Sequence, residues 1–488
     1  MKTTQRLRRL TNSQKIWLLV FIVAFSSGLY HAGSVGDTFW SLRAGQDLFH
    51  LRDIWLNRYS FEASNVYWPN HEWLWEGILY ALYWLGHRTF LIPIIVNSVL
   101  WAFTFCLSLP SEKMLATLGK RRSYGDLCFL IVAAVLFEGI FDSIRAETTS
   151  FFFLALYIYL VRRDRYKAIP FLTLLWANLH AQVFTGIMVL GMALLMTFIV
   201  KDGRELWRRK KVLTTLLWSL GATLCTPLTY RLWLYILNSL LHKPGSGIEE
   251  YQPFWVSTFL STSVMILVVL SAYSIRRIST KHKADWSLMG MLPMVAIFFF
   301  MSCSAIRSTP LFLVAILPYF MLSVSAPQSL KFKNDLGPRL GPLAYISFAA
   351  LALFMGLRVL PSNVHISDNQ MTPRDVQVFY SCKGAELNDY NDGGFLIWYA
   401  PKRKVFFDNR YDPYPASIRN TISDSFTRGD FINLVHKYNF QCAFLDSPYS
   451  SGYITLRSLG WRQTYYDHLD GFVFLVSPAY YKKYSPKG

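Results

Sequence analysis

Charged residues are scarce in this chain, and acidic residues are scarcer than basic ones. Only 16% of the 488 residues are charged, with 30 Asp and Glu against 49 Lys and Arg, whereas 53% are hydrophobic and 17% are aromatic. A composition this apolar excludes an ordinary soluble enzyme. It predicts a polytopic α-helical membrane protein.

Several short motifs are also absent. The chain has no Asn-x-Ser/Thr acceptor, which favours a bacterial or archaeal inner membrane over the membrane of the endoplasmic reticulum. It has neither Gly-x-x-x-x-Gly-Lys nor Gly-x-Gly-x-x-Gly, the usual signatures of nucleotide binding. Any chemistry that this protein performs is therefore expected to draw on an activated substrate that reaches it from the membrane.

The basic residues are concentrated in short loops between apolar stretches. The formal net charge is +19, but this distribution marks the cytoplasmic side of a membrane protein, and we expect no nucleic-acid partner. The basic loops are Lys120-Arg121-Arg122, Arg162-Arg163 to Lys167, Arg208 to Lys211, Arg276-Arg277 to Lys283, and Lys331 to Arg339.

These loops fix the expected topology. The first span, 17–32, follows a basic leader and is interpreted as an uncleaved signal-anchor with a cytoplasmic amino terminus. The segment 73–85 is too short to cross and is expected to lie at the outer interface. About eleven spans are expected in total, an odd number, so the carboxyl terminus is expected outside the cytoplasm. The other ten are 90–110, 126–141, 147–161, 168–178, 183–200, 212–227, 261–275, 286–303, 309–325 and 341–359.

Two domains are expected. Residues 1–360 form the transmembrane domain, including an outer loop at 33–88 with juxtamembrane helices, and residues 361–488 form an extracytoplasmic α/β domain. In the second domain we expect strands at 394–399, 404–408, 440–446 and 471–476, and helices at 415–425 and 429–438. Cys382 and Cys442 both fall there, and the sequence leaves open whether they pair.

Polar and charged residues gather at the expected outer ends of the spans. Asp37 follows the first span at the start of a helix expected over 38–51, where it can cap the helix, act in function, or do both. Arg43 and Asp47 are one turn apart and are expected to pair. The remaining candidates are His71, Glu72, Glu76, Arg145, Glu147, His180 and Arg307.

Among these candidates, Arg307 departs most clearly from the usual charge pattern, because it is a cation at an outer helix boundary. Snorkelling explains it, and a phosphate ligand explains it better. Arg145 and Glu147 lie in a loop so short that it must rest against the helices. His71-Glu72 lacks the number of ligands that a zinc site needs.

The order of several short motifs carries more information than each of them alone. They are Asp37-x-x-Trp40 with Gly45, Trp68-x-x-x-x-Trp73-Leu74-x-Glu76, Arg145-x-Glu147, Trp-x-Asn-x-His at 176–180, Thr226-Pro227, Tyr251-x-Pro253, Arg307, Gly393-Gly394, and Val405-Phe406-Phe407-Asp408-x-Arg410. This arrangement resembles the GT-C superfamily of integral-membrane glycosyltransferases, and within it a bacterial, mannosyltransferase-like group that uses polyprenyl-phosphate sugars. The resemblance covers nearly the whole chain.

The resemblance implies a role for each candidate. Asp37 would be the general base that deprotonates an acceptor hydroxyl. Arg307, Arg145 and His180 would bind the donor phosphate. Glu147 matches a second acidic position that binds a divalent metal, Mg²⁺ or Mn²⁺, in some relatives and none in others. His71, Glu72 and Glu76 are further candidates for substrate or metal binding.

Two departures from the family pattern bear on the substrate. Arg145-x-Glu147 supplies one acid where metal-dependent oligosaccharyltransferases carry a pair, and the tail lacks Trp-Trp-Asp-Tyr-Gly. Both argue against asparagine-linked transfer. In the outer domain Asp408 and Arg410 are expected at a strand end, where they either contact a ligand or pair with each other.

The sequence thus favours transfer of a sugar from a polyprenyl-phosphate donor, within membrane lipid, to an extracytoplasmic glycolipid, polysaccharide or protein. A transporter or flippase of lipid-linked glycan is the first alternative, but it predicts charges in mid-span and an inverted repeat, and neither is evident. The second alternative is a noncatalytic assembly protein with the same fold.

Overall fold

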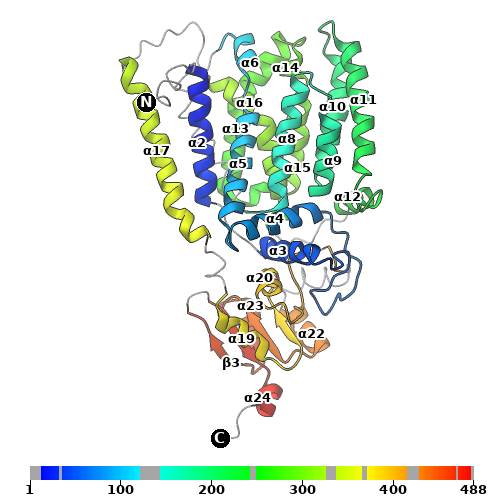
Figure 1. Ribbon diagram of the computed structural model, residues 1–488, viewed down its shortest axis with the longest axis vertical. Coiled ribbons are helices and arrows are strands. Elements are labelled where there is room, and N and C mark those ends of the chain that lie inside the picture. Colours follow the sequence, from blue (N-terminus) through cyan, green and yellow to red (C-terminus); the bar gives the residue numbers. More distant parts are fainter. Residues whose placement is uncertain are drawn as a thin grey trace. The chain divides into compact units, whose positions relative to one another are not determined.

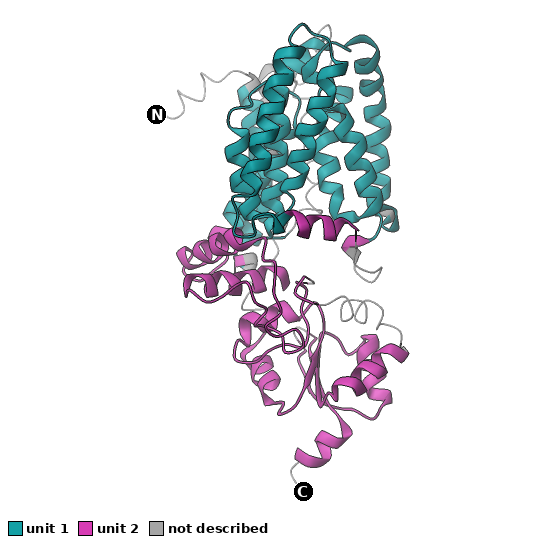
Figure 2. Cartoon of the chain, turned by 90° about the vertical axis from the view of Figure 1, so that its right-hand side faces the viewer, with its two compact units in different colours: residues 1–32, 94–232, 252–361 teal, residues 33–93, 233–251, 362–488 magenta. Residues whose placement is uncertain are grey.

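The computed structural model describes residues 12–31, 36–120, 143–241, 249–325, 337–364, 371–410, 412–414, 428–468 and 471–484. The chain divides into two compact units (Figure 2). Unit 1 comprises Met1–Ala32, Ile94–Leu232 and Gln252–Pro361, and unit 2 comprises Gly33–Pro93, Trp233–Tyr251 and Ser362–Gly488.

In its described residues unit 1 contains helices and their connections, with no strand among its elements. Its centre is α16 (Thr309–Val324), which packs against α8, α13 and α15 and buries every residue from Thr309 to Leu322. The other elements of unit 1 (Figure 1) are α2 (Asn12–His31), α5 (Leu91–Ser108), α6 (Glu112–Thr117), α8 (Ala146–Arg162), α9 (Ile169–Leu179), α10 (Val183–Ile199), α11 (Glu205–Thr223), η2 (Phe254–Val256), α13 (Thr258–Lys281), α14 (Trp286–Met289), α15 (Leu292–Ser304), η3 (Ile306–Ser308) and α17 (Gly337–Val364).

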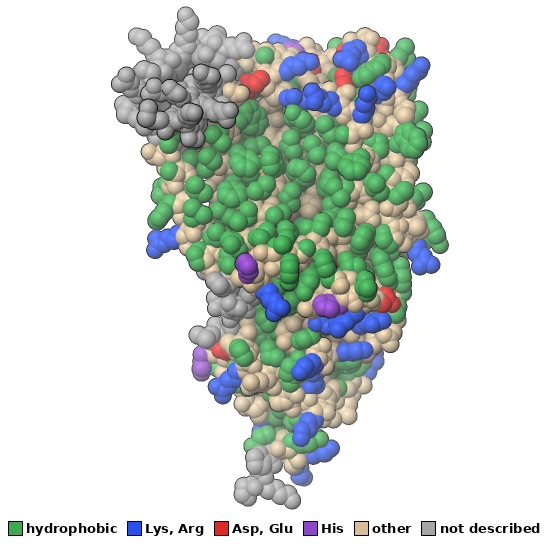
Figure 3. All heavy atoms as spheres, in the orientation of Figure 1, with side chains coloured by type: hydrophobic (Ala, Val, Ile, Leu, Met, Phe, Trp, Pro, Cys, Tyr) green, Lys and Arg blue, Asp and Glu red, His purple; other side chains and the backbone are tan. Residues whose placement is uncertain are grey.

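Four helical stretches of the described chain are long and apolar enough to cross a membrane: Leu91–Thr117, Leu260–Lys281, Trp286–Ser304 and Ile306–Val324. The least buried of them, Leu260–Lys281, has an apolar outward face as well. On α13, Val269 and Tyr273 are 65% and 64% exposed, and hydrophobic side chains cover much of the helical surface in Figure 3. Lipid explains such exposure better than water does.

These features indicate a multi-pass membrane protein, as the composition predicts. The expected span at 126–141 lies outside the described residues. The full number of eleven spans therefore stays a prediction.

Unit 2 combines helices with a small mixed sheet. The sheet has the order β1-β2-β4-β3, in which β1 and β2 are parallel and the other neighbours are antiparallel. Its elements are α3 (Gly36–Phe49), α4 (Trp73–Leu85), α12 (Arg231–Leu241), η1 (Glu249–Tyr251), α19 (Pro373–Ser381), β1 (Glu386–Asn388), α20 (Gly393–Tyr399), α22 (Arg428–Tyr438), β2 (Cys442–Leu445), α23 (Ser451–Ser458), β3 (Arg462–Tyr466), β4 (Val473–Val476) and α24 (Pro478–Tyr484).

Two of the four expected strands are confirmed and two are wrong. The segments 440–446 and 471–476 contain β2 and β4, and α22 confirms the helix at 429–438. Residues 394–399 instead belong to helix α20, because an apolar run this short does not distinguish a strand from a buried helix. Residues 404–408 form no strand; Val405 makes a single bridge to Ser60. The helix expected at 415–425 lies outside the described residues.

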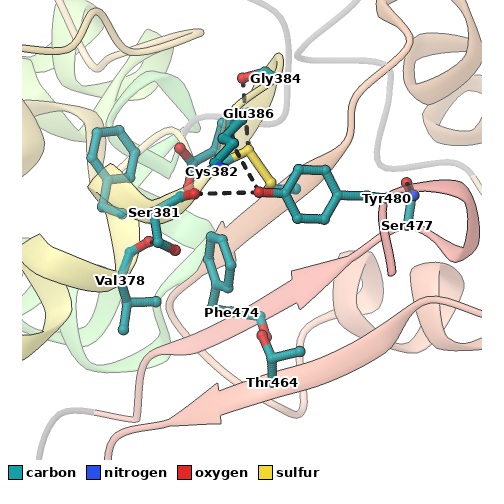
Figure 4. Close-up of a disulfide and its surroundings, with 12 residues drawn as sticks. Val378, Ser381, Cys382, Gly384, Glu386, Thr464, Phe474, Ser477 and Tyr480 are labelled. Carbon is teal, nitrogen blue, oxygen red and sulfur yellow. Dashed lines mark hydrogen bonds between the residues drawn. A yellow bond between two sulfur atoms is a disulfide. The ribbon is translucent and has the colours of Figure 1, made fainter. Parts of the chain in front are cut away.

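A disulfide joins Cys382, which follows α19, to Cys442 at the start of β2 (Figure 4). The two cysteines are 60 residues apart in the sequence and both are buried. Tyr480 from α24 lies beside them, where its hydroxyl accepts the backbone N–H of Lys383 at 3.2 Å and donates to the carbonyl of Ser381 at 3.3 Å. The pairing that the sequence leaves open is therefore present.

The outer loop belongs to the same compact unit as the carboxyl-terminal residues, rather than to the helices of unit 1. The reason is a close packing of α3 against α20. A Cβ atom added at Gly394 would overlap the carbonyl oxygen of Gly36, so this crossing needs glycine. The sequence-based boundary at 360 thus separates segments that pack together.

Candidate functional site

The predicted site residues fall in both units. Unit 1 holds Arg145, Glu147, His180 and Arg307, whereas unit 2 holds Asp37, His71, Glu72, Glu76, Asp408 and Arg410.

Asp37 lies in the first turn of α3 and is partly exposed. One of its oxygens, Oδ1, accepts a hydrogen bond from Trp40 Nε1 at 3.1 Å and another from Asn409 Nδ2. Asn409 comes from the opposite end of the sequence, and its backbone carbonyl accepts a hydrogen bond from Tyr390 at 3.1 Å. A carboxylate that served the helix terminus alone would not need this distant support.

The negative charge of Asp37 also affects Tyr390. Burial, followed by the charge of Asp37, raises the pKa of Tyr390 well above its ordinary value. Tyr390 therefore stays neutral and can donate a hydrogen bond at any physiological pH. Asp37, Asn409 and Tyr390 form a polar group at the amino-terminal end of α3.

His71 lies in a second polar group of unit 2. Its Nε2 is 3.3 Å from Glu72 Oε1, and its Nδ1 is 3.9 Å from Asp412 Oδ2. The imidazole stacks on Tyr235, whose hydroxyl donates to Asp412 at 3.0 Å. Burial lowers the pKa of His71, but the hydrogen bond and charge of Glu72, together with the charge of Asp412, outweigh it and raise the pKa above its ordinary value.

Glu76 is fully buried on α4, where Asn70 Nδ2 donates to its Oε2 at 2.7 Å. Burial raises the pKa of Glu76 well above its ordinary value, and the nearby Glu72 charge adds to the effect. Its surroundings therefore favour the neutral carboxyl group. Its position favours a structural role beneath α3, where a Cβ added at Gly45 would overlap the Glu76 carbonyl oxygen.

Asp408 and Arg410 form a buried bidentate ion pair, with Arg410 Nε to Asp408 Oδ1 at 2.8 Å and Nη2 to Oδ2 at 2.7 Å. The guanidinium also donates to Asn57 at 2.7 Å and lies over the rings of both Tyr59 and Trp68. Of the two readings that the sequence leaves open, the structure has the ion pair. It is not at a strand end, because residues 404–408 form no strand.

Three acids that the sequence analysis passed over lie together in unit 2. Asp389 and Asp446 follow the parallel strands β1 and β2, and the backbone N–H of Asp446 donates to Asp389 Oδ2 at 3.0 Å. Burial and the Asp446 charge raise the pKa of Asp389 to about 7. Burial and both neighbouring acids raise the pKa of Asp392 well above its ordinary value. The feature that could have revealed these acids is the parallel pairing of β1 and β2, which brings the carboxyl ends of both strands to the same edge of the sheet.

In unit 1, Arg307 and Glu147 form an ion pair across 160 residues of sequence. Glu147 lies in the first turn of α8, and Arg307 lies in η3 between α15 and α16. The backbone N–H of Ile306 donates to the carbonyl of Gln252 at 2.7 Å, which fixes this connection. Arg145 and His180 also interact electrostatically with the Glu147 carboxylate. The cationic groups around Glu147 therefore outnumber this single acid.

His180 is held from the side of α8. Its Nδ1 is 2.8 Å from Ser150 Oγ, and the same oxygen accepts a hydrogen bond from Trp176 Nε1 at 2.8 Å. His180 is 4% exposed. The Trp-x-Asn-x-His motif thus orients its histidine through its own tryptophan, with one serine as the link.

This part of unit 1 suits an anion better than a hard cation. Mg²⁺ prefers six oxygen ligands, whereas this group contributes one carboxylate that is already paired with a guanidinium. Arginine and imidazole groups around a single acid leave surplus positive charge, as phosphate binding needs. On unit 2 the oxygen-rich group is Asp389, Asp392 and Asp446, which is chemically better suited to a hard cation.

No protein-family model matches the chain, and no curated protein sequence is significantly similar to it.

Proposed function

We propose that this protein is a membrane glycosyltransferase that moves a sugar from a polyprenyl-phosphate donor to an acceptor hydroxyl outside the cytoplasm. The observation that carries the proposal is the setting of Asp37. It is a partly exposed carboxylate at a helix amino terminus, held by Trp40 and by Asn409 from the far end of the chain. The similarity of the motif order to the GT-C superfamily supports the same reading.

The proposed reaction is a substitution at the anomeric carbon. The acceptor oxygen attacks that carbon and gives its proton to Asp37, while the bond from the carbon to the phosphate oxygen breaks. Polyprenyl phosphate leaves with the bonding electrons and gains negative charge. In the proposal Arg307, Arg145 and His180 stabilise that charge, in keeping with the surplus of cationic groups around Glu147.

Eleven spans, a cytoplasmic amino terminus and an extracytoplasmic tail belong to the same proposal. The disulfide between Cys382 and Cys442 supports the orientation, because such bonds persist in oxidising compartments. In the proposal the envelope is that of a bacterium or archaeon, and the acceptor is a glycolipid, a polysaccharide or a protein.

A donor panel tests the proposal. Purified protein in lipid nanodiscs is given synthetic polyprenyl-phosphate sugars with envelope glycolipids and glycans, and release of polyprenyl phosphate is measured with and without a chelator. We expect release with at least one donor, and weaker donor binding in Arg307→Gln than in Arg358→Gln, an exposed α17 arginine used as control. Movement of intact donor across liposomes without release would support a flippase instead. No release and no donor binding by folded protein across the panel would overturn the proposal in favour of an assembly role.

A further inference from the structure

A second charged feature of unit 1 lies away from the Glu147 group. It is a cavity of about 380 Å³ near the carboxyl end of α8, lined in part by Arg162, Arg163, Arg165, Arg204 and Lys113. Its volume falls in the range of small-molecule pockets. Figure 3 shows Lys and Arg gathered at one end of the helices of unit 1.

Among the described residues that line this cavity, Asp164 is the one acid, and it is already paired. Asp164 accepts Arg208 Nε at 2.7 Å and Nη2 at 3.0 Å, and Arg204 Nη1 lies 3.5 Å from the same carboxylate. Arg208 is not part of the lining. Arg204 and Arg208 together balance the charges of Asp164 and of Asp202, which also pairs with Arg208. The remaining lining cations, Arg162, Arg163, Arg165 and Lys113, keep their full positive charge.

Arg162 is the buried member of the set. It is 9% exposed, and within the described part of the chain its Nε has no hydrogen-bond partner. Its Nη2 is 3.5 Å from the Tyr319 hydroxyl, and Arg163 stacks over Tyr159 at 4.5 Å. No described carboxylate pairs with Arg162, Arg163, Arg165 or Lys113. Leaving a buried guanidinium N–H without a hydrogen bond costs free energy, so this donor favours binding of a ligand that supplies an acceptor.

The lining is also apolar on one side. Leu107, Leu109 and Met114 from the end of α5 and from α6 line the cavity beside the basic groups. Loop charges that merely obey the positive-inside rule need neither a cavity nor a buried arginine. A cavity with cations on one side and aliphatic side chains on the other matches a phosphate joined to an acyl chain, rather than free phosphate.

We propose that this cavity binds the phosphate headgroup of an anionic membrane lipid. Arg162, Arg163 and Arg165 contact the phosphate, and Leu107 and Leu109 contact the lipid chain. Basic pockets between membrane helices suit such headgroups. The site is independent of the proposed sugar transfer, and the lipid serves unit 1 as a bound structural ligand.

The test uses full-length protein in detergent, titrated with phosphatidylglycerol, phosphatidylcholine or inorganic phosphate, with bound lipid read by native mass spectrometry and stability read by thermal unfolding. We expect phosphatidylglycerol to bind and to raise the unfolding temperature, and the other two to have little effect. The double variant Arg163→Gln/Arg165→Gln removes two exposed cations and is expected to weaken phosphatidylglycerol binding about 30-fold. The matched control, Lys210→Gln/Lys211→Gln on α11, removes the same charge outside the cavity and is expected to bind as wild type does.

The variant Arg162→Gln removes the buried guanidinium and is expected to weaken phosphatidylglycerol binding as well. If it unfolds the protein, the exposed pair still decides the outcome. Equal loss of binding in the control pair would mean general charge attraction and would overturn the proposal. Binding of inorganic phosphate as tight as that of the lipid, or no preference for phosphatidylglycerol over phosphatidylcholine, would overturn it as well.

Discussion

At the scale of single residues, neighbouring groups control the protonation of two titratable side chains in unit 2, His71 and Asp389. His71 is drawn toward its charged form by Glu72 and Asp412, whereas Asp389 is drawn toward its neutral form by burial and Asp446. Both shifts favour the form with less net negative charge. The Asp389 shift places a change of charge near neutral pH, and the His71 shift moves its change of charge above the ordinary histidine pKa; each has a measurable consequence.

His71 should titrate above the ordinary pKa of about 6.5 for histidine. Because the folded-state pKa is raised, its contribution to stability is fully present below the unfolded pKa and is lost as the pH rises through the folded pKa. An NMR titration of the imidazole, assigned with His71→Gln, measures this pKa. Glu72→Gln should lower it, and a wild-type pKa at or below the ordinary value would contradict the geometry.

Asp389 should make the protein less stable as the pH rises, whereas a salt-bridged carboxylate makes a protein more stable as the pH rises. Its folded pKa of about 7 exceeds its unfolded value of about 3.9, so the folded state holds the extra proton and stability falls as the pH rises between those two values. Asp446→Asn removes the neighbouring charge but keeps the backbone donor. It should lower the Asp389 pKa by about one unit and flatten the pH dependence of the unfolding temperature between pH 4 and 8. Asp430→Asn, an exposed acid on α22, serves as control, and an unchanged profile in Asp446→Asn would refute the coupling.

Local pairings are the part of the candidate site that the sequence could reveal. Arg43 and Asp47, one turn apart, do approach each other at 3.5 Å. The pairs of Arg307 with Glu147 and of Asp37 with Asn409 join residues 160 and 372 positions apart, and no local pattern encodes such contacts. The motif order singled out Asp37, Glu147 and Arg307, but it did not single out Asn409 or Asp446.

At the scale of elements, the crossing of α3 and α20 organises unit 2. Gly36 and Gly394 lie at the starts of these two helices, and each helix approaches the other through its glycine. This crossing also brings the amino-terminal end of α3 to the segment that contains Asn409. The sequence predicts a strand where α20 forms, because the helix has only seven residues and tertiary packing decides the structure of so short a segment.

Gly394→Ala should therefore destabilise unit 2. The added methyl group meets backbone atoms of Gly36, which cannot swing away, and overpacking of this kind costs about 1–3 kcal/mol. Gly429→Ala is the control, because a Cβ at that α22 position has nothing within 4 Å and should leave stability unchanged or slightly higher. Thermal unfolding of both variants tests this, and equal midpoints would argue against a close crossing.

At the scale of the whole molecule, composition and hydropathy were sufficient to identify a multi-pass membrane protein with a mixed α/β region near its carboxyl terminus. The grouping of the outer loop with the tail was not predictable, since it depends on contacts between residues 33–93 and residues beyond 362. Apolar periodicity reports burial along one element, and it carries no information on which distant element covers it.

The disulfide is the covalent constraint on this unit. In the chain-entropy account a loop of 60 residues contributes about 4 kcal/mol by restricting the unfolded state. The double variant Cys382→Ser/Cys442→Ser should unfold at markedly lower denaturant concentration, and the exposed Cys225→Ser should not. Full retention of the wild-type midpoint in the double variant would contradict a stabilising bond.

Turnover of Asp37→Asn tests the central claim most directly. Donor binding and sugar transfer are measured on the folded variant in nanodiscs, beside wild type and beside Asp53→Asn, an exposed acid of the same outer loop. We expect Asp37→Asn to bind donor as wild type does but to transfer about 10³-fold more slowly, because general-base catalysis contributes about 10²–10⁴-fold, while Asp53→Asn keeps full activity. Wild-type transfer by a folded Asp37→Asn protein would contradict the role of Asp37 as the base.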